Sequence, residues 1–225
     1  MQNNKREKTR IIEVFTGIVL ILSTLSVLIA FLTNFEFASP DRSIEEDLNF
    51  LSESALQQKT SAITWLVTGV LFVFLLPLYL MVFYRFQRWM QVINGLLITA
   101  MAMLFFRTGM AGFSIANIIE SVPGGQILQP ENQLLSFIRD SMLLIKIGLT
   151  AYGGYIFVLS ITIFRRIKFS GFLTILLFLS GPVLIVYTWL NPEHIITTSS
   201  LAISAIGLLM TGTKLVNKGL LREEE

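Results

Sequence analysis

The feature that most constrains this sequence is a series of long apolar runs. Residues 62–83 hold no charged side chain over 22 consecutive positions. An α-helix rises 1.5 Å per residue, so about 20 apolar residues cross the roughly 30 Å hydrocarbon core of a bilayer. Charged residues make up 14% of the chain, against about 25% in ordinary globular proteins. Such a chain cannot cover a globular fold with polar groups, which excludes an ordinary soluble enzyme and a disordered chain.

Six runs of this kind predict an all-α, polytopic membrane helix bundle. No segment shows the alternating ten-residue pattern of a membrane β-barrel. The sequence predicts a membrane domain over 11–216, between a basic tail at 1–10 and a second tail at 217–225. The predicted transmembrane helices are 11–33, 61–84, 90–113, 136–164, 169–190 and 195–216.

The Lys and Arg residues predict which helix ends face the cytoplasm, because cytoplasmic loops of membrane proteins are rich in positive charge. One side of the predicted bundle holds Lys5, Arg6, Lys8, Arg10, Arg85, Arg88, Arg165, Arg166, Lys168, Lys214, Lys218 and Arg222. The other side holds only Arg42 and Lys59, next to six acidic residues. We therefore expect both termini in the cytoplasm and the protein in the plasma membrane of a bacterium or an archaeon.

Two further patterns fit this topology. The first run, Val14 to Thr33, has 20 residues, more than the 7–15 of a cleaved signal peptide, which predicts an uncleaved first helix. Tryptophans are typical of membrane–water interfaces. Trp65 and Trp189 fall at predicted outer helix ends, and Trp89 falls at an inner end.

The outer loop at 34–60 contains a helix-start signal. Ser43 is followed three residues later by Glu46, which is a capping box. Apolar residues then recur at helical spacing, as Ile44, Leu48, Leu51 and Ala55. The pattern predicts a short amphipathic helix at 44–57 on the outer surface. This helix either packs over the bundle or serves to dock a partner or gate a substrate.

Four charged residues lie at or near membrane depth in the outer half of the third and fourth predicted helices. They are Arg107, Arg139, Asp140 and Lys146. A charge at mid-membrane costs about 2.5–3.5 kcal/mol on insertion scales, so such residues usually face the bundle interior, water or a partner. One hypothesis is an outward-facing cationic pocket for an anionic lipid headgroup or small anion. The other is structural: Arg139 and Lys146 snorkel to the headgroups, and Arg107 pairs with Asp140.

Prolines mark candidate helix breaks at Pro77 in the second predicted helix and Pro182 in the fifth. These positions correspond if the chain consists of two inverted three-helix halves, as in several transporters. Small residues gather in the fourth helix at Gly148, Ala151 and Gly153-Gly154. They favour close packing within the bundle, with homodimerisation as the alternative.

The residues needed for several kinds of catalysis are missing. The chain has no Cys and one His, His194, which removes thiolate chemistry and motifs that need two histidines. Ser199 and Ser200 have no candidate base nearby. We therefore predict no catalytic, cofactor-binding or metal-ligating residues and no cofactor. Short basic runs between apolar stretches also argue against nucleic acid as a partner.

The layout resembles a family of uncharacterised six-helix bacterial membrane proteins known only as a domain of unknown function. The shared features are a long first outer loop, Leu78-Tyr79 ahead of a basic turn, Arg107 near the outer end of the third helix, and Lys218-Gly219 after the last helix. The family often has an acidic residue soon after that arginine, where this chain has Thr108 and Gly109, and another in the last helix, which here is uncharged until Lys214. The resemblance implies a fold and no activity.

These observations favour a non-enzymatic membrane protein that binds or organises a lipid, a partner subunit or a small regulator. The alternative is a small transporter, or a lipid- or anion-binding protein, that uses the cationic pocket. The expected partners are the lipid bilayer and an anionic lipid or small anion, and a homo-oligomer stays open.

Overall fold

The computed structural model describes residues 2–34, 55–83, 88–121, 131–166, 171–190 and 195–221, and all of them are α-helical. The helices are α1 (Gln2–Asn34), α3 (Ala55–Phe83), α4 (Arg88–Ser121), α5 (Glu131–Arg166), α6 (Gly171–Leu190) and α7 (Ile195–Leu221). The all-α prediction is confirmed for these residues. The predicted outer helix at 44–57 lies outside the described residues, except for its last three positions, which begin α3.

Five of these helices are long and apolar enough to cross a membrane. The apolar spans are Thr9–Thr33, Lys59–Val82, Arg88–Asn117, Asp140–Ile163 and Ile195–Asn217. The apolar part of α6, Thr174–Leu190, is shorter than these. A sixth crossing therefore stays a prediction. Several helices extend past their predicted ends, because hydropathy marks the apolar part of a helix and polar residues can continue it.

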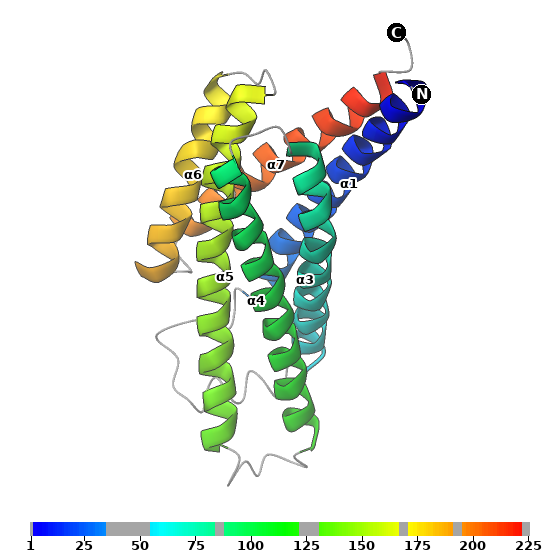
Figure 1. The fold of residues 1–225 in the computed structure, drawn as a ribbon. Helices are drawn as coiled ribbons and strands as arrows, with labels where there is room; N and C mark the ends of the chain where they lie inside the picture. Colours follow the sequence, from blue (N-terminus) through cyan, green and yellow to red (C-terminus); the bar gives the residue numbers. More distant parts are fainter. Residues whose placement is uncertain are drawn as a thin grey trace.

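The helices form a closed ring in chain order. Each helix packs against the next one along the chain, and α7 packs against α1 to complete the ring. Figure 1 shows α1 beginning and α7 ending at the same end of the bundle. The same end holds the last turns of α3 and α5 and the first turns of α4 and α6 (Figure 1). This up-and-down order is what the charge-based topology requires.

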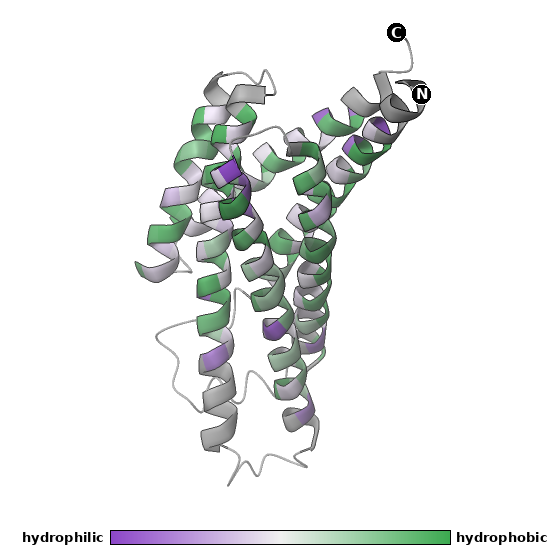
Figure 2. Cartoon of the chain, viewed as in Figure 1, coloured by the Kyte–Doolittle hydropathy of each residue, from purple (hydrophilic) through white to green (hydrophobic). Residues whose placement is uncertain are grey.

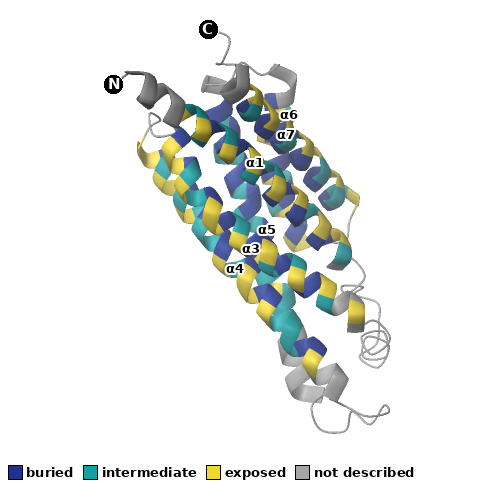
Figure 3. Ribbon diagram, turned by 90° about the vertical axis from the view of Figure 1, so that its right-hand side faces the viewer, coloured by how far each residue is buried: buried dark blue, intermediate teal, exposed yellow. Residues whose placement is uncertain are grey.

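Each helix turns one side toward the centre of the ring and one side outward. On α1, Leu20 and Val27 are buried, whereas Ile18, Leu22 and Leu25 are exposed. The same division runs along the other helices (Figure 3). Hydrophobic residues run along most of each helix (Figure 2), and all six described helices expose some of them on the outside. An outer surface of this kind suits contact with lipid rather than water.

Many hydroxyl side chains in these helices are satisfied locally, whereas a few buried ones, such as those of Thr174 and Thr198, have no hydrogen-bond partner among the described residues. Thr24, Thr68 and Thr211 donate to the carbonyl oxygen four residues earlier in their own helix, at 2.7 Å in each case. A polar group without a hydrogen bond is costly in an apolar environment, and this local bond removes most of that cost. The polar residues inside the bundle therefore do not by themselves indicate a water-filled path.

Glycines allow the closest approaches between helices. A Cβ atom added to Gly17 of α1 would lie 2.5 Å from the carbonyl oxygen of Gly212 on α7. A Cβ atom added to Gly153 of α5 would lie 2.8 Å from the carbonyl oxygen of Gly181 on α6. Gly148 faces the ring of Phe105. The glycines of α5 are therefore used for packing within the bundle, which is the alternative that the sequence favoured.

Candidate functional site

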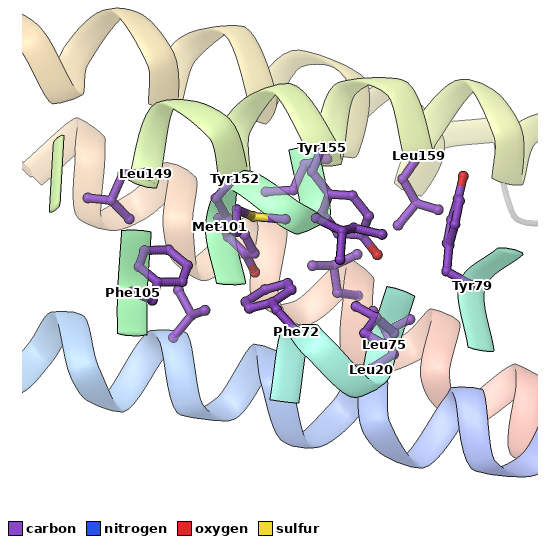
Figure 4. Packing of buried hydrophobic residues seen from close by; sticks show 14 of the residues in the cluster. Leu20, Phe72, Leu75, Tyr79, Met101, Phe105, Leu149, Tyr152, Tyr155 and Leu159 are labelled. Atoms are coloured by element: carbon purple, nitrogen blue, oxygen red, sulfur yellow. The ribbon is translucent and has the colours of Figure 1, made fainter. Parts of the chain in front are cut away.

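The centre of the ring is filled by a continuous chain of aromatic side chains. Its members come from α3, α4 and α5, and Figure 4 shows those other than Trp65 following one another along the bundle. In order along the bundle they are Trp65, Phe105, Phe72, Tyr152, Tyr155 and Tyr79, with successive ring centroids 4.9, 5.8, 6.4, 6.4 and 6.3 Å apart. Each of the six is at most 2% exposed. We call this set the aromatic core.

The aromatic core leaves the centre of the bundle packed with large side chains. Aromatic pairs at these separations attract one another beyond the area they bury. Aliphatic residues such as Leu75 and Met101 pack around the rings (Figure 4). The interior is therefore a packed, largely apolar core.

Hydrogen bonds between side chains join neighbouring helices around the ring. Ser26 of α1 bonds Thr68 of α3 at 2.6 Å, and Asn94 of α4 donates to the hydroxyl of Tyr79 on α3 at 2.6 Å. The Trp189 indole of α6 donates to Thr150 of α5 at 2.8 Å, and Ser204 of α7 donates to Ser180 of α6 at 2.9 Å. Bonds of this kind fix the rotation of one helix against the next.

Asn94 is the most polar uncharged side chain in the core. It is fully buried, and its amide oxygen has no hydrogen-bond partner. Its amide nitrogen donates to Tyr79, whose hydroxyl is also hydrogen-bonded to Thr162 of α5. The Asn94–Tyr79–Thr162 contact thus links three helices at the Tyr79 end of the aromatic core.

Replacing Tyr79 with phenylalanine is expected to lower the free energy of unfolding by about 1–2 kcal/mol, because the buried amide of Asn94 loses its acceptor. Asn94→Leu removes the amide together with its desolvation penalty, so we expect a smaller loss, below about 1 kcal/mol. Unfolding in bicelles by added dodecyl sulfate measures both values. A larger loss for Asn94→Leu would show that the amide itself stabilises the fold.

Three of the four charged residues predicted as a pocket or ion pair have side chains that the structure describes, and these three do not form ion pairs with one another. Arg107 of α4 and Asp140 of α5 are exposed, and Lys146 of α5 is half-buried. The side chain of Arg139 lies outside the described residues. Among the described side chains, no ion pair joins Arg107, Asp140 and Lys146. Their assignment to a lipid or anion site stays a prediction.

Helix α5 places Lys146 and Asp140 toward different neighbours. Lys146 is one turn from Thr150, which accepts the hydrogen bond from Trp189, so this face of α5 points toward α6. Asp140 precedes Gly154 by fourteen residues, or about four turns, and Gly154 contacts Leu97 of α4. Asp140 therefore lies on the α4 side. Lys146 and Asp140 therefore do not line one pocket together in this arrangement of α5.

The two prolines do not interrupt their helices. Pro77 lies inside α3 and Pro182 lies inside α6, and both helices continue past them. Both rings are exposed on the outside of the bundle. Paired broken helices next to a substrate site, the arrangement that suggested transport, are not seen at these positions.

The three tryptophans differ in exposure, and their placement at the membrane interfaces stays a prediction. Trp89 and Trp189 are about half exposed, as expected of interface residues, whereas Trp65 is 1% exposed and packs against Phe105. The sequence does contain a signal for this core. Trp65, Phe72 and Tyr79 recur every seven residues, which places them on one face of α3 two turns apart.

The part of the chain that the structure describes contains no group of three or more His, Cys, Asp or Glu residues able to hold a metal ion. The chain matches no family model, no curated protein and no solved structure. The likeness to uncharacterised six-helix membrane proteins therefore stays a prediction.

Proposed function

We propose that this chain is a non-enzymatic, multi-pass plasma-membrane protein with both termini in the cytoplasm, which acts by binding a partner on the outside of its helix bundle. The observation that carries the proposal is the aromatic core. Six large side chains, each at most 2% exposed, occupy the centre of the ring. A protein filled in this way has its binding surface on its exterior.

The placement of the charges and prolines supports binding rather than transport. A transporter needs a polar site near the membrane midplane that opens to either side, commonly beside broken helices. Here Arg107 faces outward, away from the aromatic core, and α3 and α6 run continuously through their prolines. The outward charges therefore remain available to groups outside the chain.

The up-and-down ring supports the proposed topology. All helix ends that flank the predicted cytoplasmic basic runs lie at one end of the bundle (Figure 1). Helix α6 has 20 residues, which is about 30 Å and enough to span the hydrocarbon core. We therefore include α6 as the sixth crossing, with α4 and α5 projecting beyond it on the outer side.

Cysteine labelling tests whether the centre is closed to water. The chain has no native cysteine, so single variants report without background. Met101→Cys and Leu149→Cys replace fully buried core residues, and Thr60→Cys replaces an exposed residue at the outer end of α3. In native membranes we expect a water-soluble maleimide to label only the Thr60 variant, and to label all three after denaturation.

Labelling of either core variant in the folded protein would contradict the proposal. It would reveal a water-filled path along the aromatic core and would favour the transporter alternative. The labelled side of the membrane, tested in intact cells and in inverted vesicles, also reports whether α3 begins on the outer side.

A further inference from the structure

Arg107 is placed where an arginine needs a partner from outside its own chain. It follows Phe105 by two residues, or about 200° around α4, so it points away from the aromatic core. Its neighbours one turn before and after, Met103 and Met110, are 68% and 52% exposed. It lies ten residues, about 15 Å, from Asn117, the outer end of the apolar span of α4. An ionised side chain on an apolar outer surface is unfavourable unless it is paired.

Asp140 lies on the same outer edge of the bundle. Asp140, Ile147 and Gly154 are seven residues apart and so share one face of α5, and Gly154 contacts Leu97 of α4. Asp140 and Ile147 are exposed, which places both on the outside next to α4. We call the outer edge marked by Arg107, Asp140 and Ile147 the α4–α5 seam.

The two charges are close in depth. Gly148 of α5 faces Phe105 of α4. Asp140 lies eight residues, about 12 Å, outward of Gly148, and Arg107 lies two residues, about 3 Å, outward of Phe105. The difference of about 9 Å is partly bridged when the long arginine side chain extends toward the outer surface. Neither residue makes an ion pair or a side-chain hydrogen bond among the described side chains.

We propose that a second copy of this chain packs on the α4–α5 seam and that Arg107 of each copy pairs with the other copy's aspartate at position 140. A two-fold axis parallel to the helices places α4 of one copy opposite α5 of the other. The same contact therefore occurs twice, as a self-complementary interface requires. The two charges, which make no ion pair among the described side chains, are then satisfied at once, and the exposed Ile147 lies close to the axis.

This inference rests on the proposal that the partner surface is on the outside of the bundle. It adds the identity of the partner and assigns Arg107 and Asp140 to it. The proposed function and the proposed dimer can be contradicted independently. Cysteine labelling tests whether the core is closed to water, and the experiments below test the α4–α5 seam.

Cross-linking tests the position of the axis. Ile147→Cys and Leu25→Cys both replace an aliphatic residue that is 38% exposed, the first at the seam and the second on the outward face of α1. In native membranes treated with a mild oxidant, we expect a covalent dimer from the Ile147 variant and none from the Leu25 variant. Equal cross-linking of both variants, or none at Ile147, would overturn the proposed interface.

Charge reversal tests the ion pairs. It also distinguishes pairs between two copies from an ion pair between Arg107 and Asp140 of the same chain. Arg107→Asp gives a seam with two acids, and Asp140→Arg gives a seam with two cations. Each should repel its own copy and lower the Ile147→Cys cross-link by about tenfold or more. Co-expression of the two variants with different tags should restore cross-linking selectively between the differently tagged chains, because only the mixed dimer pairs both charges.

Both reversed residues are exposed, so each variant should keep the size-exclusion profile and helical circular dichroism of the folded protein. If either variant loses one of these signals, Arg107→Gln and Asp140→Asn are used in its place. These substitutions remove the ion pair without adding repulsion, and each should still lower the yield of the cross-link. Undiminished cross-linking in these variants would contradict the proposed ion pairs. So would co-expression of the two charge-reversed variants without selective cross-linking between the differently tagged chains. A different outcome would overturn the proposed dimer: the wild type forms no dimer but retains an anionic phospholipid that Arg107→Gln does not retain. The partner of Arg107 would then be a lipid.

Discussion

Replacing Phe105 with alanine is expected to destabilise the protein by about 3–5 kcal/mol, the usual effect of removing a large buried aromatic side chain. Phe105 is fully buried, stacks near Trp65 and Phe72, and fills the space in front of Gly148. Lipid is as apolar as the core, so the loss arises mainly from missing packing contacts between helices. Unfolding in bicelles by dodecyl sulfate measures the change.

The neighbouring residue provides the matched control for Phe105. Phe106 is 47% exposed on the outside of α4, so Phe106→Ala should change the free energy of unfolding by less than about 1 kcal/mol. A second comparison uses Gly148, where an added Cβ would lie 2.6 Å from the Phe105 ring. Gly148→Ala should be destabilising alone but tolerated in the Phe105→Ala background. Equal effects at Phe105 and Phe106 would mean that the aromatic core does not hold the helices together.

Replacing Gly17 with alanine is expected to destabilise the bundle by about 1–3 kcal/mol, and Gly17→Leu by more, because extra carbons must enter a closed contact. A Cβ at Gly17 would meet the backbone of Gly212 at 2.5 Å and a side-chain carbon of Val216 at 2.8 Å. Backbone atoms cannot rotate away as a side chain can. The substitution therefore separates α1 from α7, the contact that closes the ring.

Gly95 on α4 is the control for Gly17. The nearest atom to a Cβ added there is a terminal carbon of Leu76, at 3.8 Å, which is an ordinary contact. Gly95→Ala should be neutral or stabilising by up to about 1 kcal/mol, because alanine favours the helix more than glycine does. Thermal unfolding of both variants in the same detergent gives the comparison. Similar losses at both glycines would contradict a specific close contact between α1 and α7.

The sequence predicted the existence, order and approximate limits of the helices better than their orientation. The ends of α6 lie close to the predicted range of 169–190, and α7 begins at the predicted residue. The largest differences are at α1, which begins at Gln2 where the sequence predicted 11, and at α4, which runs to Ser121 where the sequence predicted 113. Hydropathy reports where a helix is apolar, and it does not report where a helix stops once polar residues follow.

The charged residues show the limit of the same reasoning. Seven-residue spacing predicted that Arg139 and Lys146 share a face of the fourth transmembrane helix, but it could not reveal which neighbour that face meets. The hydrogen bond from Trp189 to Thr150 turns the Lys146 face toward α6. Arg107 could have pointed inward or outward by the sequence alone, and only the structure shows that its side chain is exposed.

The sequence by itself determined that this chain is helical and apolar enough to meet lipid, because the length and hydropathy of a segment fix whether it can satisfy its own backbone in a bilayer. The tertiary structure decided which side of each helix faces inward. Apolar residues lie on the inward and the outward sides of these helices alike, so the apolar pattern indicates the core only where large aromatic residues recur on one face, as Trp65, Phe72 and Tyr79 do. That choice is made by close contacts such as Gly17 against Gly212 and by the interlocking rings of the aromatic core.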